Sequence, residues 1–283
     1  MRGLMMTVVA LLVLVPAAGA QNKIEVKTKC PQCGTHFVAE APVPAGMALV
    51  PASSFKMGCN KKVDQECKDS EKPYHEVYLS SFFIDKTEVT VNDYAQCFEA
   101  GGCTKPLTAK ENQYCNYGQE FRDHHPINCV EWLQANQYCQ WAGKRLPTEA
   151  EWEKSARGTD GRKHPWGAEK ASCNFAILGI SGQGCGKPGT WKTCAKIKGN
   201  SPYDLCDMVG NVWEWVSDWY EEDYYGHSPK MNPRGPRTGK THVLRGGAWT
   251  SKLSETPRAS NRFFFMPGSS LANFGFRCAA DLN

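Results

Sequence analysis

The chain has 283 residues and a formal net charge of +4, and 41% of its residues are hydrophobic, including 9 Trp and 12 Phe. This composition excludes a disordered chain and allows one sizeable core or two small ones. The basic excess is slight and unclustered, which argues against nucleic acid as a partner.

The first twenty residues have the pattern of a secretory signal, because Arg2 precedes an apolar run at 4–15 and small residues at 18–20. The apolar run is shorter than the roughly twenty residues of a membrane anchor, and no later segment has the composition of a membrane span. Gln21 follows the expected cleavage site, where a lipid-anchored bacterial lipoprotein has a cysteine. We therefore expect a secreted or periplasmic protein.

Residues 21–44 form a short Pro-rich lead that contains Cys30, Cys33 and His36. The CxxC could be half of a zinc knuckle, a redox dithiol or a local disulfide. No second pair of zinc ligands lies near it, and the βαβ pattern around a thioredoxin-type motif is absent. A disulfide or an idle pair is the favoured interpretation.

Fourteen cysteines, all beyond residue 20, predict disulfides in an oxidising compartment. Cys97 and Cys103 flank a Gly-Gly turn, so a short loop would join them. Short loops also favour four further local pairs: Cys59–Cys67, Cys115–Cys129, Cys173–Cys185 and Cys194–Cys206.

The main domain, expected over residues 45–283, opens with short apolar runs that end in turn formers, which is typical of strands. These runs lie at 47–51 and 55–58, and residues 75–79 and 82–85 alternate like a further strand pair. Residues 158–202 are rich in Gly, Lys, Ser and Cys and have little periodicity. A stretch of this length without regular structure is expected to be pinned by disulfides or cations.

Three helices are predicted from their capping residues. Thr90 can cap the first, and Asn128 the second, with Glu131 three residues on. Thr148 and Glu151 form the capping box of the third, in which hydroxyl and carboxylate satisfy the free backbone N–H groups. These glutamates are assigned no chemistry.

Residues 207–216 read DMVGNVWEWV, and Trp213, Trp215 and Trp219 lie within seven residues. On an extended strand the carbonyls of Gly210 and Val212 and the carboxylate of Glu214 recur at period two. Together with Asp207 they form an all-oxygen set, the ligand type that calcium prefers. The alternative is a buried aromatic strand with a solvated Asp and Glu, and this segment alone does not separate the two.

Four segments, in this order, resemble the formylglycine-generating enzyme (sulfatase-modifying factor) superfamily. They are residues 143–153, GKRLPTEAEWE, residues 207–219, the RGG of 245–247 and the GFRCAAD of 275–281. The resemblance covers roughly residues 45–283. It implies an α+β fold, compact, mixed and largely irregular, and related to the C-type lectin fold. Members share a fold but not one chemistry, so an activity does not follow from it.

The resemblance implies a calcium ion at Asp207, Gly210, Val212 and Glu214, held by two side chains and two carbonyls. It also implies a long-range disulfide between Cys139 and Cys278. A second family calcium site would begin at Asn174 and Phe175. Residues 179–192 contain no Asp or Glu to complete it, so this second site is expected to be lost.

Active members of the superfamily carry two redox-active cysteines after the Gly-Gly pair, which bind copper and oxidise a substrate cysteine. Ser251 and Thr256 stand at these positions, and Ala248 replaces the oxygen-binding serine of the family. A hydroxyl is a poor ligand for Cu(I), for which thiolate is the natural partner. We therefore expect neither copper nor cysteine oxidation. A nucleophilic role for Ser251 lacks an oriented base.

Two classes of function remain. The first is a secreted binding or maturation factor that takes a protein or peptide in the old substrate cleft. The resemblance implies that this cleft is lined by Trp249, Arg258, Asn261, Arg262 and Asn273, and aromatic and arginine side chains suit peptide binding. The second is an enzyme of altered, oxidoreductase-type chemistry on the same cleft. A structural protein with a vestigial cleft is a third possibility.

Overall fold

The computed structural model describes residues 11–13, 23–29, 36–180, 183–252 and 258–282, and the chain divides into two units, residues 1–47 and 48–283. The first unit holds a three-stranded sheet, β1-β2-β3, formed by β1 (Leu11–Val13), β2 (Lys23–Lys29) and β3 (His36–Pro42). Residues 23–29 read KIEVKTK, which alternates at the period of a strand. Of the predicted signal segment only β1 is described, and Cys30 and Cys33 lie outside the described residues.

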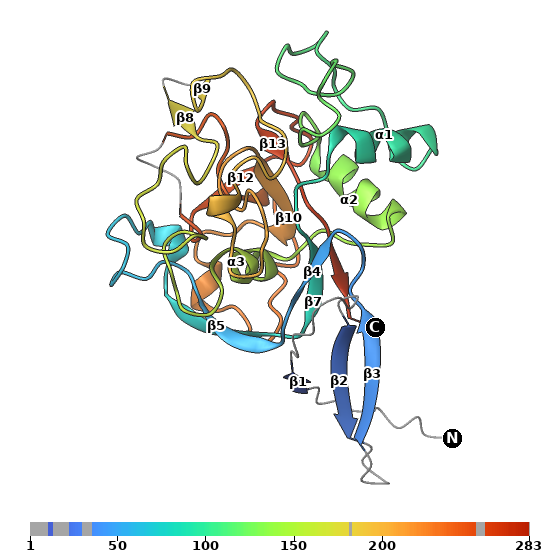
Figure 1. Ribbon diagram of the computed structural model, residues 1–283. Coiled ribbons are helices and arrows are strands. Elements are labelled where there is room, and N and C mark those ends of the chain that lie inside the picture. Colours follow the sequence, from blue (N-terminus) through green and yellow to red (C-terminus); the bar gives the residue numbers. More distant parts are fainter. Residues whose placement is uncertain (1–10, 14–22, 30–35, 181–182, 253–257, 283) are drawn as a thin grey trace. The chain divides into compact units, whose positions relative to one another are not determined.

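Four small sheets make up the second unit (Figure 1). The largest has the order β12-β11-β10-β13: β12 (Arg262–Phe265), β11 (His242–Arg245), β10 (Trp213–Trp219) and β13 (Phe274–Gly275). Another has the order β14-β7-β4: β14 (Ala279–Asp281), β7 (Phe82–Asp85) and β4 (Met47–Val50). Two hairpin-like pairs complete the set: β5 (Ser53–Met57) with β6 (His75–Leu79), and β8 (Gly179–Ile180) with β9 (Gln183–Gly184). With its short helices the unit is a mixed α+β fold, as expected.

The strands predicted at 75–79 and 82–85 lie at those residues, but they do not pair with each other. β6 pairs with β5, and β7 pairs with β14 in a different sheet. The reason lies in burial: every residue of β7 is buried, whereas β6 alternates between covered and exposed positions. A strand that is buried on both faces belongs to an inner layer, so the chain changes sheets between the two.

Two of the three helix starts are confirmed. Thr90 caps α1 (Val91–Glu99) and Thr148 caps α3 (Glu149–Arg157), each in a complete capping box. The start predicted for the second helix is wrong, because α2 (Trp132–Trp141) has Glu131 as its N-cap. The described part of the chain also contains three short 3₁₀ helices: η1 (Asp69–Glu71), η2 (Ile197–Gly199) and η3 (Tyr224–Gly226).

Asn128 does not cap α2 because its side chain is used elsewhere. Its Nδ2 donates to the carbonyls of Tyr114, at 2.8 Å, and Ala272, at 2.6 Å, and its Oδ1 accepts from the backbone N–H of Asn116. The next residue, Cys129, has φ 58° and is bonded to Cys115. The chain therefore turns at Cys129 before the helix can begin.

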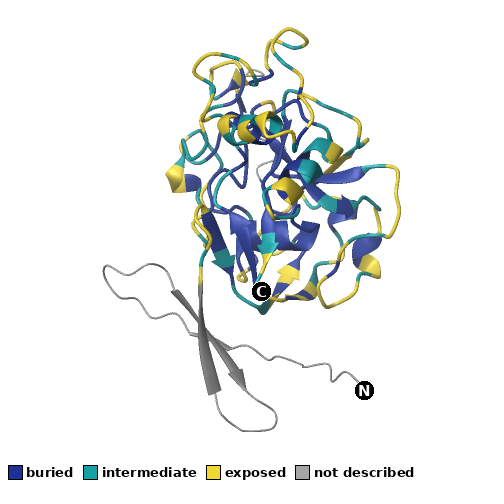
Figure 2. Ribbon diagram, turned by 90° about the vertical axis from the view of Figure 1, so that its right-hand side faces the viewer, coloured by how far each residue is buried: buried dark blue, intermediate teal, exposed yellow. Residues whose placement is uncertain are grey.

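Strand β10 lies between the two larger apolar clusters of the core. Trp215 packs into a cluster with Tyr94, Tyr138 and Phe276, and Val216 packs into the cluster that contains Trp152. Successive side chains of a strand point to opposite faces, so β10 is covered on both sides. Figure 2 shows this buried centre inside a shell of exposed loops.

Six disulfides close the second unit, and all are predicted pairs: Cys59–Cys67, Cys97–Cys103, Cys115–Cys129, Cys139–Cys278, Cys173–Cys185 and Cys194–Cys206. Two of them pin the irregular stretch 158–202, as expected. Among the described residues no helix is both long and apolar enough to cross a bilayer.

Candidate functional site

The motif at 207–216 places two carboxylates in the protein interior. Asp207 is 5% exposed and Glu214 is 1% exposed. Arg277, from the GFRCAAD segment, donates to both carboxylate oxygens of Glu214 at 2.7 Å, and Trp152 Nε1 donates to Glu214 Oε2 at 2.8 Å. Two of the family motifs thus meet in one buried ion pair, which already occupies both oxygens of Glu214.

A third buried acid, Glu88, belongs to the same cluster and was not predicted from the sequence. Burial, together with the neighbouring charge of Asp207, raises the pKa of Glu88 well above its usual range. Burial also raises the pKa of Asp207 to about 6, although the N–H of Cys194 donates to Asp207 Oδ2 at 2.6 Å. Glu88 Oε2 is buried and meets no hydrogen-bond donor in the described structure. Two adjacent buried carboxylates repel unless a proton or a cation neutralises them.

The donor chemistry of this cluster fits a calcium ion. Carboxylate oxygens are the ligands of a hard cation, and the orphaned oxygen of Glu88 is one that protein donors leave unused. Glu88 and Asp207, whose carboxyl groups lie within hydrogen-bonding reach of each other, would be the residues to hold the ion, together with the expected carbonyls of Gly210 and Val212. Because Arg277 and Trp152 bind Glu214, this carboxylate is the less available member of the predicted set.

The weak second site lies at a disulfide-closed loop. Asn174 is exposed, and the Phe175 ring stacks on Trp166 with centroids 5.1 Å apart. The Cys173–Cys185 disulfide joins the two ends of the loop. A covalent bond therefore stands where the resemblance would put a second cation.

Asn211 connects the acidic cluster to the protein surface. Its Nδ2 donates to Glu88 Oε1 at 3.0 Å, and its Oδ1 accepts the backbone N–H of Trp191 at 3.0 Å. Its own carbonyl accepts the backbone N–H of Trp249 at 2.9 Å. One buried amide thus fixes two tryptophans that lie 58 residues apart in the sequence.

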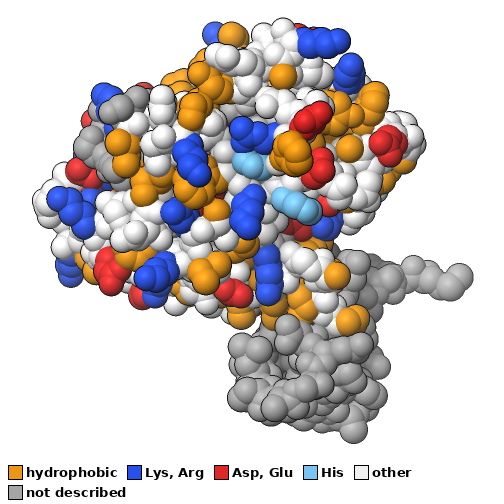
Figure 3. Space-filling model, turned by 45° about the horizontal axis from the view of Figure 1, so that its top comes forward, with side chains coloured by type: hydrophobic (Ala, Val, Ile, Leu, Met, Phe, Trp, Pro, Cys, Tyr) orange, Lys and Arg blue, Asp and Glu red, His pale blue; other side chains and the backbone are white. Residues whose placement is uncertain are grey.

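Trp249 is 5% exposed and has the more exposed Tyr114, Trp191, Thr250 and Asn273 around it. These five residues are here called the Trp249 face. The Tyr114 ring covers that of Trp249 at a centroid distance of 5.4 Å, and Asn273 Nδ2 donates to Thr250 Oγ1 at 3.0 Å. Trp191 Nε1 donates to the carbonyl of Gly184 at 3.0 Å. Figure 3, which looks toward the end of the unit that carries β8 and β9, shows hydrophobic side chains between Lys and Arg.

Ser251, at the position of the first redox cysteine, has a structural contact. The N–H of Ala248 donates to Ser251 Oγ at 3.0 Å, and the N–H of Ser251 donates to the Ala248 carbonyl at 2.8 Å. The hydroxyl therefore closes the turn that follows the Gly-Gly pair. Thr256, at the second position, lies outside the described residues. All twelve cysteines in the described ranges are paired in disulfides.

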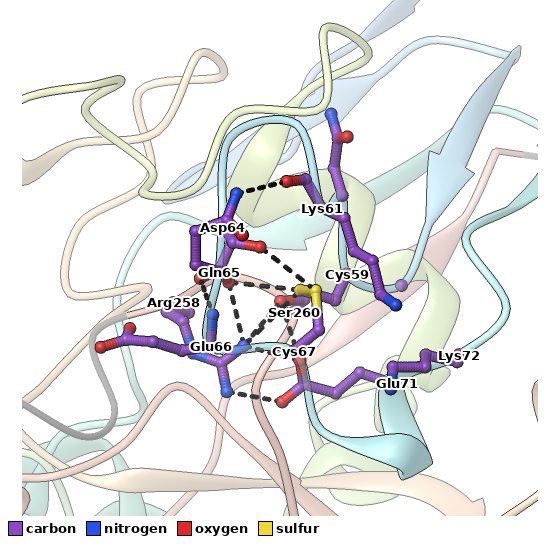
Figure 4. The surroundings of a disulfide bond; sticks show 12 residues. Cys59, Lys61, Asp64, Gln65, Glu66, Cys67, Glu71, Lys72, Arg258 and Ser260 are labelled. Carbon is purple, nitrogen blue, oxygen red and sulfur yellow. Dashed lines mark hydrogen bonds and ion pairs between the residues drawn. A yellow bond between two sulfur atoms is a disulfide. The ribbon is translucent and has the colours of Figure 1, made fainter.

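Three predicted ligand-contacting residues lie inside the protein instead. Arg258 is 1% exposed and donates to both oxygens of Glu71 at 2.6 Å and to Asp64 Oδ2 at 3.0 Å (Figure 4). Arg262 is equally enclosed and holds Glu149 through Nε at 2.7 Å and Nη2 at 3.0 Å.

The side chain of Asn261 is also buried and accepts a hydrogen bond from Lys68 Nζ at 3.0 Å. Protein carboxylates thus hold both guanidinium groups inside the protein, although Arg258 Nε and Asn261 Nδ2 have no hydrogen-bond partner among the described residues. Of the residues expected to line the cleft, Arg258, Asn261, Arg262 and also Trp249 are buried in the described structure, while Asn273 is partly exposed.

Known proteins are similar to this chain in sequence and in fold. The profile of the FGE-sulfatase family, described as the sulfatase-modifying factor enzyme 1-like domain, matches residues 35–282. The formylglycine-generating enzyme of Streptomyces coelicolor is 42% identical over 282 residues, which cover 83% of this chain and 89% of that enzyme. The serine/threonine-protein kinase pkn1 of Chlamydia pneumoniae is 33% identical over 264 residues, covering 86% of this chain but only 39% of the kinase.

The structure of PvdO from Pseudomonas aeruginosa superposes with a TM-score of 0.71 at 24% identity, covering 94% of this chain and 100% of that chain. At this level of identity the likeness concerns the fold alone. The match of the family profile extends over most of the sequence and confirms the resemblance based on the four motifs. The chain therefore belongs to the FGE-sulfatase family.

Proposed function

We propose that this protein is an exported, calcium-stabilised binding or maturation factor that takes a peptide segment on its Trp249 face and does not oxidise cysteine. The observation that carries the proposal is the role of Ser251, whose hydroxyl accepts the N–H of Ala248 and closes a turn. A serine has no thiolate to offer, and this hydroxyl already accepts a backbone hydrogen bond. Copper-dependent oxidation needs thiolates, because a hydroxyl without a lowered pKa binds Cu(I) poorly.

Peptide binding is supported by the chemistry of the Trp249 face. Tyr114 is 37% exposed, and the side chain of Thr250 is also open to solvent. An aromatic ring offers a large rigid contact area at little entropic cost, while hydroxyl and amide groups can pair with a peptide backbone. The face is built on Asn211, so its geometry depends on the buried acidic cluster.

Calcium is supported by the same cluster. A cation at Asp207 and Glu88 would neutralise two carboxylates that otherwise repel each other inside the protein. Export is supported by the signal-like residues 1–20 and by six disulfides, which persist in oxidising compartments.

The oxidase activity is tested with the purified, copper-loaded protein and a cysteine-containing peptide of the sulfatase type. Mass spectrometry would follow loss of the thiol and gain of an aldehyde. We expect no turnover, while the Streptomyces coelicolor formylglycine-generating enzyme in the same assay serves as the positive control. Turnover that is lost on mutation of the Trp249 face would contradict the proposal and favour an enzyme of altered chemistry.

Binding is tested with Tyr114→Ala, which removes the exposed ring without cutting into the core. Affinity for a bound peptide should fall by about tenfold, the effect expected of an aromatic anchor worth more than 1 kcal/mol. Tyr78→Ala is the matched control, because Tyr78 is also 37% exposed and lies on β6. If Tyr114→Ala and Tyr78→Ala lowered the peptide affinity equally, the Trp249 face would not be the binding site.

A further inference from the structure

The segment between Glu169 and Asp204 is strongly basic. It carries five lysines, Lys170, Lys187, Lys192, Lys196 and Lys198, and no Asp or Glu, whereas the whole chain has a net charge of +4. The expectation of an unclustered basic excess is therefore wrong for this segment. A concentrated charge of one sign attracts the opposite sign at short range.

Two of these lysines are held at one aromatic ring. Lys187 Nζ lies 5.0 Å and Lys196 Nζ lies 4.7 Å from the centroid of Trp191. An aromatic face attracts an ammonium group, which limits the motion of each side chain. The ring Nε1 donates to the carbonyl of Gly184 at 3.0 Å, and the backbone N–H of Trp191 donates to Asn211 Oδ1 at 3.0 Å. Two positive charges are thus held at one aromatic side chain.

The loop that contains Arg122 packs against this segment, and it carries Glu120 and Asp123 beside that arginine. Arg122 Nη1 donates to the carbonyl of Thr190 at 3.2 Å, and the N–H of Thr193 donates to the carbonyl of His124 at 3.0 Å. These bonds hold the loop beside residues on both sides of Trp191. The disulfides Cys173–Cys185 and Cys194–Cys206 fix the segment at both ends. Lys187, Lys196 and Arg122, here called the basic group, therefore lie on a surface that disulfides and backbone hydrogen bonds hold in place.

The basic group borders the Trp249 face. The Cα of Gly184 lies so close to Trp249 that a Cβ there would come within 3.1 Å of the Trp249 side chain. The same Gly184 accepts the hydrogen bond from Trp191. A ligand on Tyr114 and Thr250 would therefore extend toward Lys187 and Lys196.

We propose that the ligand of the Trp249 face is an acidic peptide segment, whose carboxylates pair with Lys187, Lys196 and Arg122. This inference rests on the proposed peptide-binding function and adds the charge of the ligand. Nucleic acids and sugars commonly use an open aromatic platform for stacking. Here lysines lie over Trp191 and Tyr114 covers Trp249, so charge pairing with carboxylates fits the surface better.

The test uses the protein without residues 1–20 and two fluorescein-labelled decapeptides. One alternates Asp and Glu with Ala and one Tyr, and the other replaces each acid by Asn or Gln. Fluorescence anisotropy would give the affinity of each at low and moderate salt. We expect the acidic peptide to bind at least tenfold more tightly, with an advantage that shrinks as salt screens the charges.

The decisive variant is Lys187→Gln with Lys196→Gln, which should reduce the affinity for the acidic peptide about tenfold and leave that for the amide peptide unchanged. The matched control is Lys62→Gln with Lys240→Gln, two exposed lysines outside this segment. Melting curves of both double variants check that they fold like the parent protein.

Three outcomes would overturn the inference. Equal binding of the two peptides, still dependent on Tyr114, would leave the peptide-binding function and remove the acidic ligand. Tighter binding of a sulfated polysaccharide than of the acidic peptide, lost in the Lys187/Lys196 variant, would assign the basic group to a different class of ligand. Binding of neither peptide, before and after Tyr114→Ala, would remove the proposed function as well.

Discussion

Asn211 donates its side-chain N–H to Glu88 at 3.0 Å, and this bond joins the buried acids to the surface that is proposed to bind a ligand. The carboxyl group of Glu88 comes from the turn between β7 and α1, and the amide comes from the motif before β10. Because Asn211 also accepts the N–H of Trp191, we expect a change in the acidic cluster to affect the Trp249 face. Stability and binding are thus expected to change together.

Replacing Asn211 by alanine tests this connection. The change would leave Glu88 Oε1, which is buried, and the N–H of Trp191, which is part-buried, without their partners. An unsatisfied buried polar group costs about 1–3 kcal/mol, so we expect a loss of roughly 2–4 kcal/mol in the free energy of unfolding. Urea denaturation followed by tryptophan fluorescence measures it. Asn112→Ala, at a surface turn, is the control, and an equal loss there would argue against a special role for Asn211.

Glu88→Gln separates a cation-bound cluster from a proton-bound one. Without a cation, the change removes one of two repelling buried carboxylates and should raise the melting temperature at pH 8. With bound calcium, it removes a ligand and should lower the melting temperature and weaken the effect of EDTA, because a ligand that binds only the folded state stabilises it. Asp207→Ala should abolish the EDTA effect. A melting curve that EDTA leaves unchanged in the parent protein contradicts the calcium site.

The long-range disulfide should contribute more to stability than the short ones. Cys139 and Cys278 are separated by 139 residues, and Cys97 and Cys103 by 6. On the chain-entropy model the free energy of unfolding should fall by about 5 kcal/mol without the long bridge and by about 2 kcal/mol without the short one. Paired Cys→Ala variants of each bridge, compared by urea denaturation, provide the measurement. A larger loss from the short pair would contradict the expected order.

The features that sequence predicts correctly depend on residues close together in the chain. Thr90 and Thr148 meet their capping partners three residues on, and five of the six disulfides close short loops. Cys139–Cys278 is the exception, and only the family resemblance pointed to it. The helix caps and the short-loop disulfides can be predicted because their partners lie nearby in the sequence and distant parts of the chain do not take part in them.

The incorrect predictions concern side chains whose partners lie far away in the sequence. Arg258 is 187 residues from Glu71, and Arg262 is 113 residues from Glu149. Asn128 is 144 residues from Ala272. From the sequence alone, an arginine near the Gly-Gly motif can be taken for a ligand-binding residue. Only the tertiary fold brings a carboxylate to it. Glu88 was missed for the same reason, because its role depends on Asp207.

The buried pair of Arg258 and Glu71 should be costly to break. Arg258→Met leaves the Glu71 carboxylate without its cation and Asp64 with Lys163 alone, and breaking such a buried pair costs about 3–5 kcal/mol. Adding Glu71→Gln should recover part of the free energy of unfolding, because it removes the unpaired charge. Lys72→Met is the control, since its pair with Asp69 is exposed to solvent and should have no resolvable effect. A similar loss from Arg258→Met and Lys72→Met would contradict the structural role.

Asp218 should make the stability of the protein depend on pH in an unusual direction. Its side chain is enclosed, and burial, with the nearby charge of Glu149, raises its pKa to about 7, although it accepts hydrogen bonds from the N–H of Glu149 and from Ser217. In the unfolded chain this carboxyl has its ordinary pKa of 3.8. The folded state therefore binds more protons between about pH 4 and pH 7, so this group's contribution to stability falls as the pH rises through that window.

Asp218→Asn removes this titration while keeping an oxygen that can accept the N–H of Glu149. His242 has the opposite effect, because burial lowers its pKa to about 4. Its contribution to the free energy of unfolding therefore falls as the pH drops below 6.5. Only the difference between the two proteins isolates Asp218. Urea denaturation from pH 4 to pH 8 should show the variant gaining stability over the parent as the pH rises, by at most about 4 kcal/mol at 1.36 kcal/mol for each pKa unit. Parallel curves for the two proteins would mean that Asp218 titrates normally.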